Sequence, residues 1–318
     1  MTATESAPSP TGAPPVAAPP VLALDVGASR IKAAVIAADG SRVAELRHPT
    51  GRTDGPDAVL ARITEVAAAA SGPGIACAGI AVCGAVGPDG LVTAVNLGWE
   101  AVPAGRALSD RLGVPVTVLN DAHAGALGEG GFGAARDMSD YLYVSLGTGI
   151  GAAIVKDGRV LAGAHGRAGE LGHICVDQRG PECACGSRGC LETFMSAAAL
   201  EARWLAAHGS QLSAREIIDR VIAREPSASA LWDEAVEALA EGLLTAMSLF
   251  DPAVIVLGGG LTGAGPRLTE PLTAAIAARS RPFHAGAELR LASLGDWSGC
   301  AGAAVAARQA GQAGHEFT

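Results

Sequence analysis

The chain carries one local pattern twice, and this repeat limits its possible folds more than any other feature. In each copy a buried strand is followed by a glycine turn, a second strand and an Asp-Gly hairpin signal. Together with the helical segments between them, these hairpins predict an α/β protein. The predicted strands are Val21–Val26 and Ile31–Ala37 in the first copy, and Tyr141–Leu146 and Ile150–Val155 in the second.

The two copies can be aligned by a shift of 120 residues, which places Gly27 on Gly147 and Val35 on Val155. The Asp-Gly signal then recurs with a two-residue deletion. Two unrelated hairpins would also produce these few matches. An internal duplication would instead build two similar domains that face each other across a cleft.

The repeat sets the expected domain boundaries. We expect an N-terminal α/β domain over residues 21–122 and a larger C-terminal α/β domain over residues 123–297. The last helix, residues 298–310, is expected to pack on the N-terminal domain. Residues 1–20 contain six prolines and no basic residue, which indicates a disordered Pro/Ala-rich tail rather than a signal peptide.

Apolar periodicity predicts further strands and helices outside the two hairpins. The predicted strands are Arg42–Arg47, Ile75–Val82, Val114–Leu119, Ala253–Leu257 and Ala287–Leu294. One helix is predicted around the apolar positions Val59 to Ala70, a second over Ala107–Leu112 and a third over a segment that ends at Phe250. Two more are predicted over about Arg267–Arg279 and Ser298–Gln309.

Composition excludes several classes of protein. A hydrophobic fraction of 49% can build a sizeable core, which argues against a disordered chain. A net charge of −9 provides no electrostatic footprint for nucleic acid or an anionic membrane. The longest uncharged stretch, residues 66–88, contains seven Gly or Pro residues and is not expected to span a membrane. We therefore expect a cytoplasmic protein with no nucleic-acid or membrane partner.

Three glycine turns follow predicted strands and are candidates for phosphate binding: Gly27, Gly147-Thr148-Gly149 and Gly258-Gly259-Gly260. Backbone N–H groups without neighbouring side chains can approach phosphate oxygens closely. No G-x-x-x-x-G-K-[ST] run exists, and Gly149 is followed by a strand, not by the helix of a dinucleotide fingerprint. The turns favour a hairpin phosphate clamp in which Asp25 orients a metal ion. Taken alone, Asp25 would be interpreted as a solvated strand end.

Cysteines cluster in one short segment. In a reducing compartment, clustered thiols indicate a metal site before they indicate disulfides. Together with His173, Cys183, Cys185 and Cys190 form a donor set that suits a closed tetrahedral zinc site. Such a site has no open position for water, so the predicted role is structural. Buried free thiols beside an unrelated histidine are the alternative.

The zinc motif is also the most specific motif of the chain. The pattern E-x-G-H, a spacer and C-x-C-G-x-x-G-C-x-E runs intact over Glu170–His173 and Cys183–Glu192. In this motif and in the order of its other motifs, the chain resembles the ROK family (repressors, open reading frames and kinases), especially its bacterial glucokinases. The resemblance implies an actin-like, RNase H-like ATPase fold with two duplicated domains around a nucleotide–sugar cleft. It further implies ATP, Mg²⁺ and structural Zn²⁺ as cofactors, and a homo-oligomer (dimer or tetramer).

The resemblance also implies roles for single residues. The catalytic base of the family, the Asp of its N-D-A motif, matches Asp121. The sugar-binding residues of the family match Asn96, Asn120, Asp121, Glu170, His173 and Glu192. Its zinc ligands match His173, Cys183, Cys185 and Cys190. A carboxylate at a strand end can accept the proton of a primary hydroxyl, which suits phosphoryl transfer.

The chain departs from the family pattern at several positions. The ATP-binding turn D-x-G-G-T-K reads Asp25-Val26-Gly27-Ala28-Ser29-Arg30. Val95 precedes Asn96 where the family often has Pro, His123 stands where Asn is frequent, and Ala197 stands where Gly is frequent. Several of these changes surround the predicted sugar pocket. An amino sugar or a C7-cyclitol with a primary hydroxyl therefore remains an alternative acceptor.

These observations predict ATP-dependent phosphorylation of the primary hydroxyl of a hexose, most directly glucose. The alternative from another class is a non-catalytic sugar sensor or repressor. Only 20 residues precede the first strand and none is basic, which argues against a DNA-binding helix-turn-helix. An interaction module stabilised by zinc is a third hypothesis.

Overall fold

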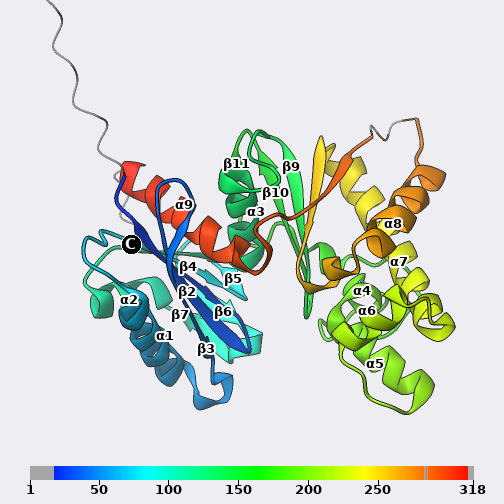
Figure 1. The fold of residues 1–318 in the computed structure, drawn as a ribbon, viewed down its shortest axis with the longest axis horizontal. Coiled ribbons are helices and arrows are strands. Elements are labelled where there is room, and N and C mark those ends of the chain that lie inside the picture. The colour runs from blue at the N-terminus through cyan, green and yellow to red at the C-terminus, as the bar shows by residue number, and fades with distance from the viewer. Residues whose placement is uncertain (1–17, 283, 285, 314–318) are drawn as a thin grey trace, which may run out of the picture.

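The computed structural model describes residues 18–282, 284 and 286–313. It is an α/β fold with two five-stranded sheets and one small three-stranded sheet (Figure 1). No helix among the described residues is long and apolar enough to cross a membrane. The tail predicted over residues 1–20 lies outside the described residues, apart from residues 18–20.

The N-terminal sheet combines the first hairpin with two parallel strands. Its order is β3-β2-β1-β4-β8, in which β1 and β3 are antiparallel to β2, and β4 is parallel to both β1 and β8. The strands are β1 (Val21–Val26), β2 (Arg30–Ile36), β3 (Arg42–Pro49), β4 (Ala78–Val82) and β8 (Val116–Asn120). The small sheet consists of β5 (Ala85–Val86), β6 (Val92–Ala94) and β7 (Trp99–Val102).

The C-terminal sheet repeats this order and these directions. Its order is β11-β10-β9-β12-β13, with antiparallel pairs β11–β10 and β10–β9 and parallel pairs β9–β12 and β12–β13. An internal duplication explains the matching topology, whereas two unrelated hairpins do not. The strands are β9 (Tyr141–Leu146), β10 (Ile150–Lys156), β11 (Arg159–Val160), β12 (Val254–Gly258) and β13 (Glu288–Leu291).

The turns of the two hairpins differ by one residue. Val26 pairs with Ile31 in the first hairpin, and Leu146 pairs with Ile150 in the second. The shift between the copies is therefore 120 residues in the first strand but 119 in the second strand. The constant shift used in aligning the sequence is wrong beyond the turn.

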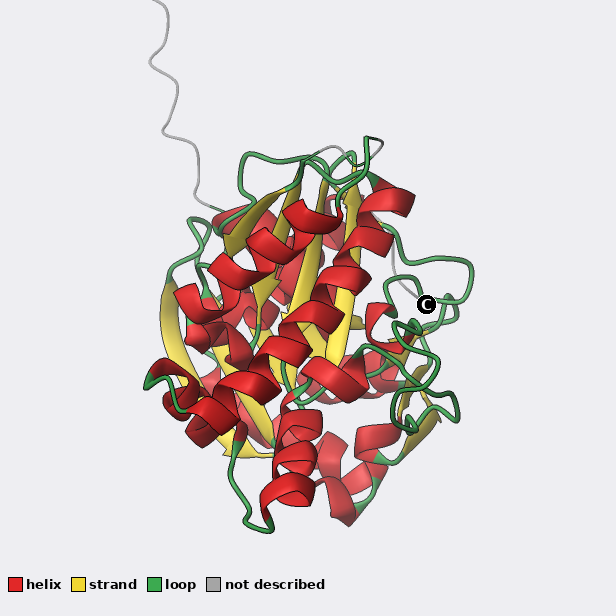
Figure 2. Ribbon diagram, turned by 90° about the vertical axis from the view of Figure 1, so that its right-hand side faces the viewer, coloured by secondary structure: helices red, strands yellow, loops and turns green. Residues whose placement is uncertain are grey.

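Helices cover both sheets (Figure 2). Helices α1 and α2 contribute to the core on one face of the N-terminal sheet, and α9 returns from the end of the chain to cover the other face. Helices α5 to α8 form the large core of the C-terminal sheet. The helices are α1 (Pro56–Ala70), α2 (Ala104–Leu112), α3 (Asp121–Phe132), α4 (Glu192–Met195), α5 (Ala197–His208), α6 (Ala214–Ile222), α7 (Pro226–Phe250), α8 (Pro266–Arg279) and α9 (Ser298–Ala313). Short 3-10 helices are η1 (Arg52–Asp54), η2 (Val95–Leu97), η3 (Leu171–His173), η4 (Gly260–Ala264) and η5 (Gly295–Trp297).

Helix α3 connects the two halves of the molecule, and the sequence patterns do not predict it. It follows β8 of the N-terminal sheet, yet Ala126 packs in a core cluster with Tyr141 and Val254 of the C-terminal sheet. A side chain at Gly128 would overlap the backbone of Ser298 in α9. Glycine within a helix disfavours it in isolation, but here it lets the two helix backbones approach closely.

The buried carboxylate of Glu129 binds both segments that link the halves of the molecule. On the segment after α3 it accepts a hydrogen bond from the N–H of Ala134 (2.8 Å). On the segment between β13 and α9 it accepts bonds from the N–H groups of Ser293 and Leu294 (3.0 and 3.1 Å) and from the hydroxyl of Ser298 (2.7 Å). These donors offset the cost of burying the charge.

Several element boundaries differ from the predictions for a common reason. Strand β4 begins at Ala78 rather than Ile75, because its pairing with β1 starts there. Strand β13 has four residues, Glu288–Leu291, which are those that pair with Val254–Leu257 of β12. The boundaries of these strands therefore depend on pairing with a neighbouring strand that is distant in sequence.

Candidate active site

Asp121 is the first residue of α3, directly after the carboxyl end of β8. Asn120 caps the helix, because its side-chain oxygen accepts hydrogen bonds from the N–H groups of Ala122 and His123 (2.9 and 3.2 Å). The amide of Asn120 also donates to the carbonyl of Gly84 (3.0 Å). The cap thus fixes the start of the helix and the position of the Asp121 carboxylate.

The protein around Asp121 stabilises the protonated, neutral carboxyl group relative to the ionised one, compared with the same group in water. Its side chain is open to solvent on one side and surrounded by protein on the others. Desolvation by that protein, together with the negative charges of Asp25 and Glu170, raises the pKa of Asp121 to about 7. A carboxylate with this pKa can both accept and release a proton near neutral pH.

Asp25 lies near the end of β1 and is paired with Lys32 across the first hairpin. The two residues are directly opposite in the β1–β2 register, and Lys32 Nζ lies 2.7 Å from Asp25 Oδ2. Burial opposes the charged form of Lys32, but the charge and hydrogen bond of Asp25 outweigh it and raise the pKa of Lys32. Lys32 Nζ also donates to the carbonyl of Asp296 (2.6 Å), which precedes α9.

The sequence analysis missed this role of Lys32. The signal that could have revealed it is the turn length. If Val26 and Ile31 are taken as the last pair before the turn, Lys32 falls opposite Asp25.

The other two glycine turns lie side by side at the end of the C-terminal sheet. Gly258 is paired with Ser145, and the turn Gly147-Thr148-Gly149 follows β9 immediately. Segments after the zinc motif hold this turn: the N–H of Ala197 donates to the carbonyl of Gly147 (2.8 Å). The N–H of Ile150, directly after the turn, donates to Glu192 Oε2 (2.8 Å).

The four predicted zinc ligands come together. The donor atoms of His173, Cys183, Cys185 and Cys190 all lie within 4.8 Å of one another. Cys183 Sγ is 3.6 Å from His173 Nδ1, and Cys185 Sγ is 3.7 Å from Cys190 Sγ. A tetrahedral zinc ion would hold a thiolate and a ring nitrogen about 3.5 Å apart, and two thiolates about 3.8 Å apart. The donor set and its spacing therefore fit zinc.

Glu170 and Glu192 lie on opposite sides of the zinc cluster in sequence. Glu170 is exposed and directly precedes η3, which ends at His173; Glu192 begins α4, two residues after Cys190. The charge of Glu170 acts on both Asp121 and His123, so these groups are neighbours. A metal ion held by these four residues would fix the backbone next to both carboxylates.

Asn96 is the predicted site residue that the structure connects least to the others. It is exposed in η2 beside the small sheet. Among the described residues, no hydrogen bond or ion pair joins it to Asp121, Glu170 or Glu192. Its assignment to the sugar site rests on the family motif alone.

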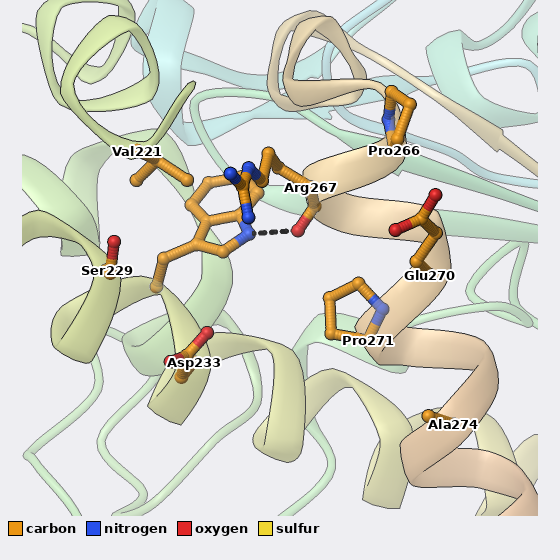
Figure 3. Close-up of a pocket in the computed structure, with 9 residues that line it drawn as sticks. Val221, Ser229, Asp233, Pro266, Arg267, Glu270, Pro271 and Ala274 are labelled. Atoms are coloured by element: carbon orange, nitrogen blue, oxygen red, sulfur yellow. Dashed lines mark hydrogen bonds between the residues drawn. The ribbon is translucent and has the colours of Figure 1, made fainter. Parts of the chain in front are cut away.

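One cavity of about 410 Å³ lies far from these residues, between α6, α7 and α8 (Figure 3). Pro271 within α8 has no N–H, so the carbonyl of Arg267 lacks its helical partner. The indole N–H of Trp232 donates to that carbonyl instead (2.9 Å). The cavity thus borders a hydrogen-bonded contact between α7 and α8.

Two five-stranded sheets with the same strand order and directions, each with a hairpin at its N-terminal strands, are the arrangement of an actin-like ATPase fold. The crystal structure of a ROK family glucokinase from Streptomyces griseus, in complex with glucose and AMPPNP, matches with a TM-score of 0.83 at 29% identity. The match covers 91% of this chain and 99% of that chain. The predicted fold class is confirmed.

The particular family follows from the sequence comparisons. The ROK family profile matches residues 21–310, and the chain belongs to this family. A glucokinase from Halalkalibacterium halodurans is 32% identical over 303 residues, which are 88% of this chain and 92% of that protein. A xylose repressor from Bacillus subtilis is 30% identical over 202 residues, but the match covers only 63% of this chain and 52% of the repressor. The chain is therefore similar to glucokinases over most of its length and to repressors over part of it.

Proposed function

We propose that this protein is an ATP-dependent sugar kinase that phosphorylates the primary hydroxyl of a hexose, with glucose as the first candidate. The observation that carries the proposal is Asp121, a carboxylate fixed at the start of α3 with a pKa of about 7. Relatives named glucokinase that match nearly the whole chain support the same reaction class.

In this proposal Asp121 acts as general base. Its ionised carboxylate accepts the proton of the primary hydroxyl while the hydroxyl oxygen forms a bond to the γ-phosphorus of ATP and the bond to ADP breaks. A base with a pKa near the working pH is ionised in a large fraction of molecules and still binds the proton when the reaction requires it. Asn120 supports this role by fixing the helix start.

The proposed nucleotide site consists of backbone turns and one charged pair. The amides near Gly27, Gly147 and Gly258 are the candidates for the phosphates, and Asp25 is the candidate for Mg²⁺. Bound Mg²⁺ would supply positive charge at the phosphate oxygens. Lys32, whose Nζ lies 2.7 Å from Asp25 Oδ2, holds this carboxylate in place.

The proposed acceptor site consists of Asn96, Asn120, Glu170, His173 and Glu192. Glu170 and Glu192 are acceptor groups that suit sugar hydroxyls. Glu192 uses Oε2 for the N–H of Ile150, which leaves Oε1 for the acceptor. If His173 binds zinc through Nδ1, its Nε2 remains available to a hydroxyl.

An amino sugar or a C7-cyclitol is the second candidate for the acceptor. The observation that favours it is the set of departures around this site, among which His123 lies beside Glu170. Both candidate acceptors require the same chemistry at Asp121. Only turnover measurements distinguish them.

The decisive experiment is an ATP-consumption screen of the purified protein against glucose, mannose, fructose, N-acetyl sugars, amino sugars and cyclitols. D121N, purified in parallel, is the control for contaminating kinases. We expect turnover with at least one acceptor in the wild type and about 1,000-fold less in D121N. Acceptor binding without any turnover in the wild type would overturn the kinase proposal in favour of a sugar sensor.

A further inference from the structure

His123 makes a contact that the proposed chemistry does not use. It lies in the first turn of α3, and its ring atom Nε2 lies 3.3 Å from the carbonyl oxygen of Ala168. Since a carbonyl oxygen only accepts, this nitrogen is the donor. Burial is the main influence on the pKa of His123 and lowers it, so the ring is neutral at pH 7 and donates through Nε2–H.

Ala168 belongs to a segment that leads directly to Glu170. We call residues 161–170 the Glu170 loop. Both ends of the loop are tied to β10: the N–H of Leu161 donates to Ile154 (2.9 Å), and the N–H of Ala152 donates to Gly169 (3.0 Å). Gly169 has φ +95°, and a side chain there would overlap the carbonyl of Ala152. These anchors hold the loop to the C-terminal sheet.

His123 ties the same loop to the first turn of α3, the helix that begins at Asp121. It follows β8 of the N-terminal sheet and lies two residues after Asp121. Within the described part of the chain, His123 is the one residue whose side chain hydrogen-bonds to residues 161–170. The bond therefore connects the segment that carries Glu170 to the helix that carries Asp121.

We propose that His123 is a positioning residue that sets the place of Glu170 relative to Asp121, and thereby the binding of the sugar-like acceptor. The zinc cluster fixes the chain after Glu170 through His173, and His123 fixes the chain before it. This inference rests on the proposed kinase function. It assigns a residue to acceptor binding that touches neither the nucleotide turns nor the metal.

The test compares H123F, which keeps a flat ring but cannot donate, with H123Q, which keeps a donor. H208F is the matched control, because His208 also bonds a backbone carbonyl through its ring (Nδ1 to Trp204, 3.1 Å) but lies in α5. In H123F we expect the acceptor KM to rise about 5- to 10-fold, the cost of one neutral hydrogen bond. We expect the KM for ATP to change less than twofold, and H123Q to stay within about threefold of the wild type.

A second measurement does not depend on activity. Hydrogen exchange of the peptide that covers residues 161–170 should be several-fold faster in H123F than in the wild type or H208F. If the wild type has no kinase activity, the proposed function fails, while this exchange still decides whether His123 holds the loop.

Four results would overturn the inference. These are unchanged exchange in H123F, an unchanged acceptor KM, equal effects of H123F and H123Q, or a loss of kcat alone. The last result would mean that the substitution acts on Asp121 directly rather than through Glu170.

Discussion

The two hairpins share a topology but are stabilised by different interactions. The first, β1–β2, carries a charged pair within itself, Asp25 with Lys32. The equivalent residue of the second, Ser145, is paired with Gly151, and no charge lies at this level of the hairpin. Its turn is held instead from outside, by Glu192 and by Ala197.

This difference shows that the two copies of a duplicated hairpin can position different groups. The first hairpin positions a carboxylate and its counter-charge without help from the zinc motif. The turn of the second hairpin carries no charged side chain, and it is held by the segment that follows Cys190. A metal ion bound by His173 and the three cysteines would therefore support the second copy of the repeat and not the first.

The largest effect is expected at Asp121, which belongs to neither hairpin. D121N should lower kcat about 1,000-fold, because the general base is lost, while acceptor affinity changes little. The measurement is steady-state kinetics combined with calorimetric titration of the acceptor. If D121N retains a tenth of the wild-type kcat, Asp121 is not the base.

The next effect tests the dependence of the second hairpin on the metal. Removing zinc with a chelator, or substituting C185S, should lower Tm by about 5–15 °C. Hydrogen exchange should increase around Gly147 and stay unchanged around Gly27. Equal loss of protection in both turns would refute the asymmetry, and C175S, a change outside the ligand set, is the control.

A smaller effect concerns pH. Because the pKa of Asp121 is about 7, kcat should fall about tenfold per unit below pH 7. Asp25 contributes to this raised pKa, so D25N should move the acid limb of the residual activity to lower pH, whereas S145A in the second hairpin should not move it. A flat profile between pH 5 and 7 in the wild type would contradict the assignment.

The same carboxyl group links stability to pH. Its pKa in the folded state lies above the ordinary value of 3.8, so between about pH 4 and 7 the folded protein keeps a proton that the unfolded chain loses. This group therefore lowers stability as pH rises through that window. D121N should gain Tm over the wild type at pH 8 and not at pH 4, as thermal melts at the two pH values can check.

The smallest effect compares the only two lysines of the chain, one in each hairpin. K32M removes the partner of Asp25 and should raise the KM for ATP about fivefold. K156M removes the exposed ion pair between Lys156, the last residue of β10, and Asp140. It should change neither KM nor Tm measurably. Equal kinetics for K32M and the wild type would mean that Asp25 keeps its position without a counter-charge.

Local patterns predicted the hairpins and the zinc ligands because both depend on residues that are close in sequence. They did not predict α3, since Gly125, Gly128, Gly130 and Gly131 resemble a loop until the close approach of α9 and β9 is known. The strand-end position of Asp121 was predicted, but its raised pKa was not, because the burial that mainly causes it and the charges of Asp25 and Glu170 come from segments distant in sequence. Contacts of this kind exist only after the two halves have assembled.

The return of α9 to the N-terminal sheet has a consequence for the order in which the protein is made. Val21, Ala23, Ala34 and Ile36 form an apolar face that α9 covers. A ribosome synthesises this face long before it synthesises α9, so the sheet stays incomplete until α9 has emerged. During that interval the nascent chain exposes this apolar face. Chaperones therefore have more time to bind the N-terminal sheet than the C-terminal sheet.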